Sequence, residues 1–287
     1  MDKKLMKSLF GTSYMPKINL QLKEVSMAAQ KMAGKLSISG VQPKLSLKLN
    51  RKKKELEIAD IEGEYILKPQ TETFPNLPQN EYLCMSIASR LGIDVPPNTL
   101  ISLKDKTLAY VVKRFDRIKG EKLHQEDFSQ ILGEKNKYDG SFERIGKKIK
   151  EISDIPGLDT QLFFERVLFF FVIGNGDAHL KNFSITYNKK ARKRLSPAYD
   201  IVSSKLVIPD EEDLALTLNG KKNNINKNDF EKFAETLKIA TRVSYRNILG
   251  KIGLISSSIK NSILSIDEKK KLLTIVKERS ERLGTVQ

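Results

Sequence analysis

Apolar and polar residues alternate along much of the first third of the chain, and this period of two predicts β-strands. Segments 45–50 and 55–58 both alternate, and the charged run 51–54 between them predicts a hairpin turn. Apolar residues take a helical spacing at 79–91, and Pro96 and Pro97 end that helix. Further strands are expected at 64–68, 99–103 and 107–113.

Beyond residue 117 the pattern becomes mainly helical. Segment 161–173 is apolar on nearly all sides, which predicts a central buried helix. Segment 229–237 carries one apolar face, and a capping-box sequence at Ser265 opens a last helix that runs to Leu283. A short strand-rich insert lies between these helices, at 183–187 and 193–195.

Together these patterns predict an α+β fold of two lobes. A β-rich N-terminal lobe would take residues 1–115 and a mainly helical C-terminal lobe residues 116–287, with the boundary near 114–119. Two lobes joined in this way leave a cleft, which is the usual place for a bound nucleotide.

Composition narrows the class of protein. The 287 residues are 39% hydrophobic and 30% charged, as in soluble globular proteins. The longest apolar run, 167–173, is too short to span a membrane, and no secretory signal opens the chain. One cysteine and two histidines exclude an internal disulfide and a zinc site. We therefore expect a cytoplasmic protein. The net charge of +16 indicates either a lysine-rich solvated surface or an acidic partner such as nucleic acid.

The segment from Gly174 to Asn182, GNGDAHLKN, is the most informative for chemistry. It follows the buried helix directly, and Asp177 lies five residues before Asn182. An aspartate that accepts a proton from an attacking hydroxyl and an asparagine that binds metal need a short rigid loop between them, and kinase catalytic loops have this spacing. Lys181 would neutralise the transferred phosphoryl group. The structural alternative is a polar turn that caps the helix.

Asp200 follows Asn182 by 18 residues, and a strand hairpin fits between them. Such a hairpin would return Asp200 to the loop, where its carboxylate and Asn182 would form a magnesium site of hard oxygen ligands.

Lys68 ends the third predicted strand, and Glu81 lies 13 residues on in the first turn of the predicted helix. A strand lysine held by a helix glutamate orients the α- and β-phosphates of ATP in kinases. The alternative is a surface ion pair of little energetic value. Before the first strand, the glycines and serines of 34–44 offer backbone N–H groups to phosphates.

Seven sequence motifs resemble, in order, those of HipA-type toxin kinases. They are SISGVQPKLSL, EYILKPQ, PQNEYLCMSIASRLGI, VVKRFDR, HQEDFSQILG, GNGDAHLKNFSI and LSPAYDI. The resemblance covers nearly the whole chain from Gly34, and it implies a two-lobed protein-kinase-like fold with Ser/Thr kinase activity that uses ATP and Mg²⁺.

The resemblance also implies roles for individual residues. Asp177 resembles the catalytic base, with Lys181 beside it, and Asn182 and Asp200 resemble the magnesium ligands. Lys113 and Phe115 fall at the hinge, where the backbone of family members contacts adenine. The positions that resemble nucleotide-binding residues are Ser39, Gly40, Gln42, Lys44, Lys68, Glu81, Lys113, Phe115 and His179.

Only 33 residues precede Gly34, which resembles the short HipT kinases of three-gene toxin systems. That resemblance implies autophosphorylation at Ser37 and Ser39, an aminoacyl-tRNA synthetase as substrate, a small HipS-like partner and a HipB-like DNA-binding antitoxin. Segment 14–32 holds several apolar residues, which form either a docking surface for the small partner or an ordinary helix and strand of the lobe.

Three other functions stay open at this stage. Small-molecule phosphotransferases of the same two-lobe plan share the spacing of the Asp177 loop. A non-catalytic binding module would retain only the fold, although here every expected catalytic position is filled. A direct nucleic-acid binder would use the positive charge, and its binding would be sensitive to salt.

Overall fold

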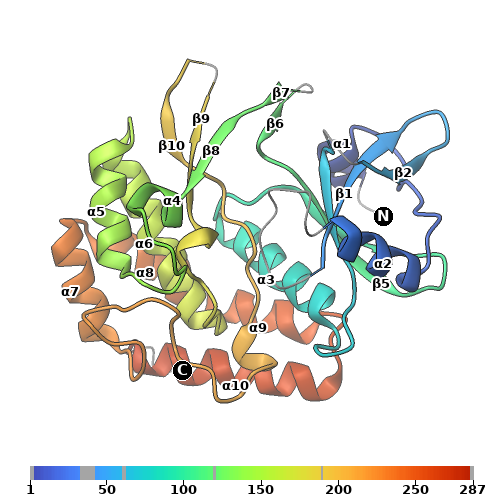
Figure 1. The fold of residues 1–287 in the computed structure, drawn as a ribbon. Helices are drawn as coiled ribbons and strands as arrows, with labels where there is room; N and C mark the ends of the chain where they lie inside the picture. Colours follow the sequence, from blue (N-terminus) through green and yellow to red (C-terminus); the bar gives the residue numbers. More distant parts are fainter. Residues whose placement is uncertain (1–2, 33–42, 60–62, 119–120, 189, 285–287) are drawn as a thin grey trace. The chain divides into compact units, whose positions relative to one another are not determined.

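The computed structural model describes residues 3–32, 43–59, 63–118, 121–188 and 190–284, which form two compact units (Figure 1). Unit 1 comprises Met1–Tyr82 and Pro96–Lys122, and unit 2 comprises Leu83–Val95 and Leu123–Gln287. The mixed α+β content agrees with the expected fold class. Along the described ranges, no helix is both long enough and apolar enough to cross a membrane.

Unit 1 is built on a five-stranded antiparallel sheet with the order β2-β1-β3-β5-β4. The predicted hairpin around residues 51–54 joins its first two strands, and Lys68 at the end of β3 lies opposite Tyr110 of β5. The strands are β1 (Leu45–Asn50), β2 (Glu55–Ile58), β3 (Tyr65–Lys68), β4 (Asn98–Ser102) and β5 (Leu108–Lys113), and a small hairpin follows from β6 (Arg117–Ile118) and β7 (Glu121–Lys122).

The helices of this region correct the expectation of a single helix there. In addition to α3 (Leu77–Leu91), which begins in unit 1 and continues in unit 2, α1 (Lys3–Phe10) and α2 (Leu22–Met32) precede the sheet. Met6, Leu9 and Phe10 of α1 are buried, as are Val25 and Ala29 of α2, because each helix turns its apolar face to the core of the unit. Much of the apolar surface of segment 14–32 is therefore used inside this unit.

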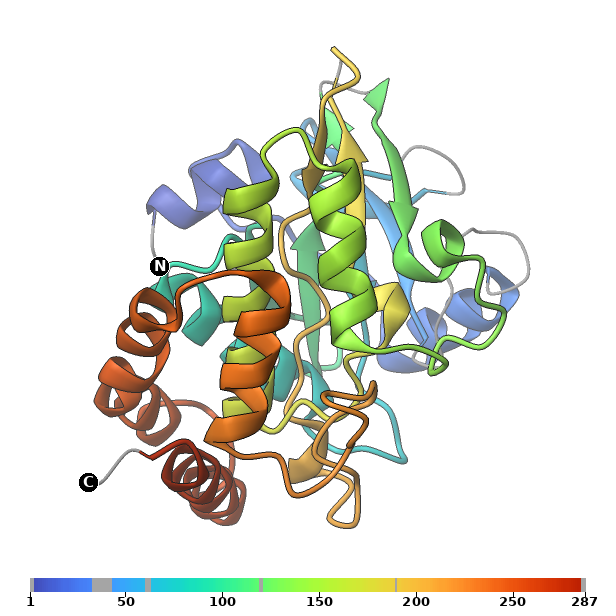
Figure 2. The same cartoon turned by 90° about the vertical axis from the view of Figure 1, so that its left-hand side faces the viewer.

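Helices dominate unit 2, as the sequence predicts. The buried helix α6 packs against four others, α5, α7, α8 and α10 (Figure 2). Its side chains from Phe163 to Ile173 are all buried. The helices are α4 (Phe128–Leu132), α5 (Phe142–Ile152), α6 (Pro156–Ile173), α7 (Lys227–Leu237), α8 (Thr241–Ile248), α9 (Ile252–Lys260) and α10 (Ile266–Arg282).

A three-stranded antiparallel sheet of order β10-β9-β8 completes unit 2. Strands β9 (Ser184–Tyr187) and β10 (Lys193–Leu195) match the predicted insert, whereas β8 (His124–Asp127) was missed within a region expected to be helical. The four polar residues of β8 carry no apolar alternation, and the strand forms because it pairs with β9, some 60 positions away.

Candidate active site

The loop that carries Asp177 leaves the buried helix α6 at Gly174. This glycine has a φ of +75°, and its N–H donates to the carbonyls of Phe170 and Phe171, which closes the last turn of the helix. A Cβ atom at Gly174 would lie 2.8 Å from Cγ2 of Ile275, so only glycine fits. The start of the loop is thus fixed by the most buried helix of unit 2.

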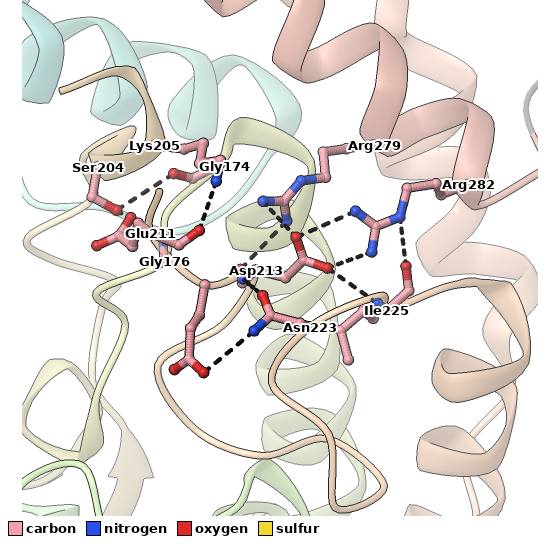
Figure 3. A network of polar contacts seen from close by, with 11 residues as sticks. Gly174, Gly176, Ser204, Lys205, Glu211, Asp213, Asn223, Ile225, Arg279 and Arg282 are labelled. Carbon is pink, nitrogen blue, oxygen red and sulfur yellow. Dashed lines mark hydrogen bonds and ion pairs between the residues drawn. The ribbon is translucent and has the colours of Figure 1, made fainter. Parts of the chain in front are cut away.

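A second segment, around η2 (Ser204–Leu206), packs against this loop and hydrogen-bonds to it (Figure 3). The N–H of Gly176 donates to Oγ of Ser204 at 2.8 Å, and a Cβ at Gly176 would lie 2.5 Å from Oε2 of Glu211. Lys205 connects the two segments: its N–H donates to the carbonyl of Gly174 at 3.1 Å, and its ammonium donates to that of Glu211 at 2.7 Å.

Asp177 differs from its neighbours because its side chain is exposed, while residues 174–176 and 178–180 are buried. Its backbone carbonyl accepts the N–H of His179 at 2.8 Å, which keeps the loop tight. Its carboxylate oxygen Oδ1 accepts the phenol of Tyr138 at 2.8 Å. A carboxylate on a rigid loop and open to solvent is suited to receive a proton from a bound hydroxyl.

Asn182 and Asp200 are brought together as the predicted hairpin requires. Nδ2 of Asn182 donates to Oδ2 of Asp200 at 3.4 Å, and Oδ1 of Asn182 accepts the N–H of His179 at 2.9 Å. Asp200 has a φ of 60°, which is uncommon for a residue other than glycine and directs its side chain from a constrained backbone. The hydroxyl of Tyr199 donates to the carbonyl of Lys181 at 2.9 Å and so joins the two ends of the hairpin.

This pair of hard oxygen donors fits Mg²⁺ better than a softer metal. Magnesium is usually held by one or two protein oxygens, with phosphate and water completing its shell. Over the part of the chain that the structure describes, no group of three or more His, Cys, Asp or Glu side chains is arranged to hold a metal ion. Asn182 and Asp200 stay candidate ligands for a magnesium that also binds phosphate, because both carry hard oxygen atoms.

His179 is buried in the middle of the loop. Burial lowers the pKa of His179 below its ordinary value, and the charge of Lys137 acts in the same direction against those of Asp177 and Asp200. The imidazole is consequently neutral at physiological pH, and it adds no positive charge beside the carboxylates.

In unit 1 the structure joins Lys68 to Glu81. The ammonium of Lys68 lies 2.7 Å from Oε1 of Glu81, with side-chain exposures of 7% and 1%. The Lys68 ammonium also lies 5.9 Å from the ring centroid of Tyr110. This pair is buried, so the alternative of a surface ion pair does not apply to it.

The remaining predicted residues are placed less directly. The N–H of Lys113 donates to the carbonyl of Pro97 at 2.9 Å, so a contact with adenine through this N–H would compete with that bond. Phe115 follows β5, and Lys44 precedes β1. Lys181 is half-buried in the loop. Four predicted positions lie outside the described residues: Ser37, Ser39, Gly40 and Gln42.

Three residues near the loop had no signal in the sequence. Tyr138, Ser204 and Glu211 lie 39 residues before, 27 after and 34 after Asp177, and none belongs to a periodic pattern. Their contacts with the loop arise from tertiary packing, so only the structure identifies them.

The fold and these residues define a protein of the kinase-like class. The chain belongs to the HipA-like C-terminal domain family, whose model matches residues 36–258. The loop of Asp177 and the hairpin that leads to Asp200 both lie within the matched residues.

Relatives of known name are described as kinases. A candidate kinase of Haemophilus influenzae is 37% identical over 193 residues, which cover 62% of this chain and 55% of that protein. The candidate kinase Y4dM of Sinorhizobium fredii is 34% identical over 68% of this chain and 51% of its own length. The serine/threonine-protein kinase toxin HipA of Shewanella oneidensis is 30% identical over 64% of this chain and 47% of its own. The chain thus spans about half the length of the curated relatives it matches.

Solved structures agree with this assignment. The HipA chain in a complex of HipA, HipB and operator DNA from Shewanella oneidensis matches with a TM-score of 0.71 and 26% identity, over 87% of this chain and 65% of that one. The proinflammatory kinase CtkA of Helicobacter pylori matches with a TM-score of 0.61 over 87% of this chain and 91% of its own, and at 20% identity it supports the fold alone. The expected two-lobed kinase-like fold is confirmed.

Proposed function

We propose that this chain is an ATP-dependent kinase that phosphorylates a serine or threonine hydroxyl of a protein, as the toxin of a toxin–antitoxin system. The observation that carries the proposal is the loop of unit 2. There an exposed Asp177 stands on a rigid turn, and Asn182 and Asp200 meet at 3.4 Å beside it. The kinase names of the relatives support the same activity.

In unit 2, Asp177 would accept the proton of the attacking hydroxyl, and Lys181 would neutralise charge on the transferred phosphoryl group. Asn182 and Asp200 would hold Mg²⁺, which neutralises charge on the phosphate oxygens of the nucleotide when it is bound. His179 is neutral and would contribute shape and hydrogen bonding to the nucleotide site rather than charge.

In unit 1, Lys68 would contact the α- and β-phosphates of ATP, with Glu81 fixing the position of its ammonium. The backbone near Lys113 and Phe115 would contact adenine. We retain the division into an N-terminal lobe, residues 1–115, and a C-terminal lobe, residues 116–287. The remaining proposed nucleotide-binding residues lie in the serine- and glycine-rich loop, namely Ser39, Gly40, Gln42 and Lys44.

We further propose that the chain acts as a HipT-like kinase, with autophosphorylation at Ser37 and Ser39. Its substrate would be an aminoacyl-tRNA synthetase, such as the tryptophanyl or glutamyl enzyme. Its partners would be a small HipS-like protein and a HipB-like DNA-binding antitoxin. The presence of HipB and operator DNA in the Shewanella HipA structure supports the last of these.

Mass spectrometry of the purified chain, incubated with ATP and Mg²⁺ and compared with an Asp177→Asn variant, tests the activity and the modified residue together. We expect phosphate on Ser37 or Ser39 of the active chain and none on the variant. Transfer to small hydroxyl compounds, with no phosphate on this chain or on any added protein, would instead favour a small-molecule phosphotransferase.

A further inference from the structure

The hydroxyl of Tyr138 occupies the carboxylate proposed as the catalytic base. It donates to Oδ1 of Asp177 at 2.8 Å, and among the described residues this is the single hydrogen bond that the Asp177 side chain makes. In a kinase reaction, the acceptor hydroxyl must donate to this same carboxylate before its proton is transferred. One hydroxyl of the protein therefore takes up an acceptor position on Oδ1, one of the two oxygens to which a substrate hydroxyl could donate.

The phenol of Tyr138 keeps its proton at physiological pH. Burial raises the pKa of Tyr138 above its ordinary value, and the hydrogen bond to Asp177 raises it further. The phenol therefore stays protonated at physiological pH and can donate to the carboxylate whenever it faces Asp177.

The backbone around Tyr138 is fixed against the catalytic loop. The N–H of Leu180 donates to the carbonyl of Lys137 at 3.1 Å, and the N–H of Thr217 donates to that of Gly140 at 3.3 Å. A Cβ atom at Gly140 would lie 3.0 Å from Cδ2 of Leu180, so the two loops are in close contact. Tyr138 thus approaches Asp177 from a segment that is itself held in place.

The ring of Tyr138, by contrast, is partly open to solvent. It is 38% exposed, its edge meets His179 at a centroid distance of 5.4 Å, and the Lys137 ammonium lies 4.8 Å from its centre. An exposed aromatic side chain changes rotamer on a fast timescale, and this rotation breaks none of the backbone hydrogen bonds of the loop. A rotation of the Tyr138 side chain would therefore uncover Oδ1 of Asp177 without a change in the backbone of the loop.

We propose that the Tyr138 hydroxyl is an intramolecular competitor of the acceptor hydroxyl. The substrate hydroxyl would bind Oδ1 of Asp177 at the position of the Tyr138 hydroxyl. The Tyr138 side chain would rotate away to admit it. This inference rests on the proposed kinase function. In the reaction, the acceptor oxygen forms its bond to the γ-phosphorus, the bond from that phosphorus to the β,γ-bridging oxygen breaks, and ADP leaves with the electron pair. The acceptor proton goes to Asp177.

Competition of this kind has a defined kinetic signature. An acceptor that binds only the fraction of molecules with Tyr138 rotated away has an apparent affinity reduced by that fraction. A hydrogen bond to a charged group shifts an equilibrium by about tenfold or more. Removing the hydroxyl should therefore lower the KM for the acceptor and leave kcat unchanged.

The test compares Tyr138→Phe with wild type and with a matched control, Tyr187→Phe. Tyr187 also donates its phenol to a carboxylate, Glu126 at 2.5 Å, but lies on β9 away from the loop. Phosphate transfer from labelled ATP is measured against increasing amounts of phosphatase-treated protein extract from the organism that encodes the chain. We expect Tyr138→Phe to lower the KM by about tenfold or more, and Tyr187→Phe to match wild type.

Each other outcome overturns the inference in a distinguishable way. If wild type transfers phosphate and Tyr138→Phe has an unchanged KM or a reduced kcat, Tyr138 supports Asp177 instead of competing for it. Phosphate found on Tyr138 itself would make it an acceptor. If wild type transfers no phosphate to protein, the proposed function fails and this inference fails with it. A readout without turnover is the pH titration of ¹³Cζ-labelled tyrosine: Asp177→Asn should lower the pKa of Tyr138, and an unchanged titration excludes the hydrogen bond.

Discussion

The ammonium of Lys68 and the carboxylate of Glu81 form a buried ion pair at 2.7 Å, between the last residue of β3 and the first turns of α3. Breaking a buried ion pair by removal of one partner typically costs about 3–5 kcal/mol. We therefore expect Lys68→Met to lower the unfolding free energy by about this amount, measured by urea denaturation, and to abolish ATP binding in calorimetry.

The double variant Lys68→Met with Glu81→Leu separates the two effects. Replacing both charges by apolar groups should recover most of the lost stability, because nothing charged is left buried. ATP binding should stay lost, since the phosphate-binding ammonium is absent. Recovery of ATP binding together with stability would mean that Lys68 has only a structural role.

Asp213 holds in place the segment around Glu211, which packs against the loop of Asp177 (Figure 3). Its carboxylate accepts from Arg279 at 2.9 Å, from Arg282, and from the N–H of Ile225 at 3.1 Å, and Arg279 is only 4% exposed. Asp213→Asn should cost about 3–5 kcal/mol of stability, because the Arg279 charge loses its partner. Glu281→Gln removes an exposed ion pair with Lys277 at 3.9 Å on α10, the helix that carries Arg279. This control should change the unfolding free energy by less than about 1 kcal/mol.

The same carboxylate predicts a pH dependence. Burial alone would raise the pKa of Asp213, but the hydrogen bond from Arg282 and the charge of Arg279 hold it below its ordinary value. A lowered folded-state pKa gives stability that is present above the unfolded value and lost as pH falls through the folded one. The stability difference between wild type and Asp213→Asn should therefore shrink in thermal melts toward acidic pH, and a constant difference would contradict this.

Glu211 should give the opposite pH dependence of stability. Burial raises the pKa of Glu211, and the charge of Asp177 raises it further against contacts with Ser204 and Lys205. A raised folded-state pKa gives stability that is present at low pH and lost as pH rises through that value. Glu211→Gln should thus gain melting temperature relative to wild type as pH rises above the ordinary pKa of a glutamate. The control Glu235→Gln, at an exposed site of α7, should show no such trend.

Asp200 is expected to set the response to magnesium. Asp200→Asn removes the charged member of the pair with Asn182, so nucleotide binding should need a higher concentration of Mg²⁺. Magnesium titrations in a nucleotide-binding assay measure the change, with Asp210→Asn as an exposed control ten residues on. An unchanged magnesium midpoint in Asp200→Asn would place the metal elsewhere.

Much of the fold could be predicted because its elements carry local patterns. The hairpin of β1 and β2 shows apolar alternation, and α6 shows a long apolar run. Helix α1 also has a helical apolar spacing, at Met6, Leu9 and Phe10, but a segment of eight residues is too short for this pattern to predict a helix by itself. Strand β8 could not be predicted, because its four polar residues are a strand only through pairing with β9.

The residues of the candidate site also fall into those that a local sequence pattern marks and those that only tertiary structure brings together. Asp177 and Asn182 could be selected as candidates because a short loop fixes their spacing along the chain. Tyr138 and Glu211 could not, because distant segments bring them to the loop and nothing in their own neighbourhoods marks them. Local sequence thus predicts the candidate reacting groups, and tertiary structure shows which residues surround them.

The most direct test of the account is transfer of labelled phosphate from ATP to protein by wild type and by Asp177→Asn. The Asp177 side chain is exposed, so the substitution should leave the melting temperature unchanged. Loss of a general base typically costs about 10²–10⁴-fold in rate, and we predict a fall of this size in the variant. Transfer by Asp177→Asn at the wild-type rate, or no transfer by a folded wild-type chain with ATP and Mg²⁺, would contradict the account.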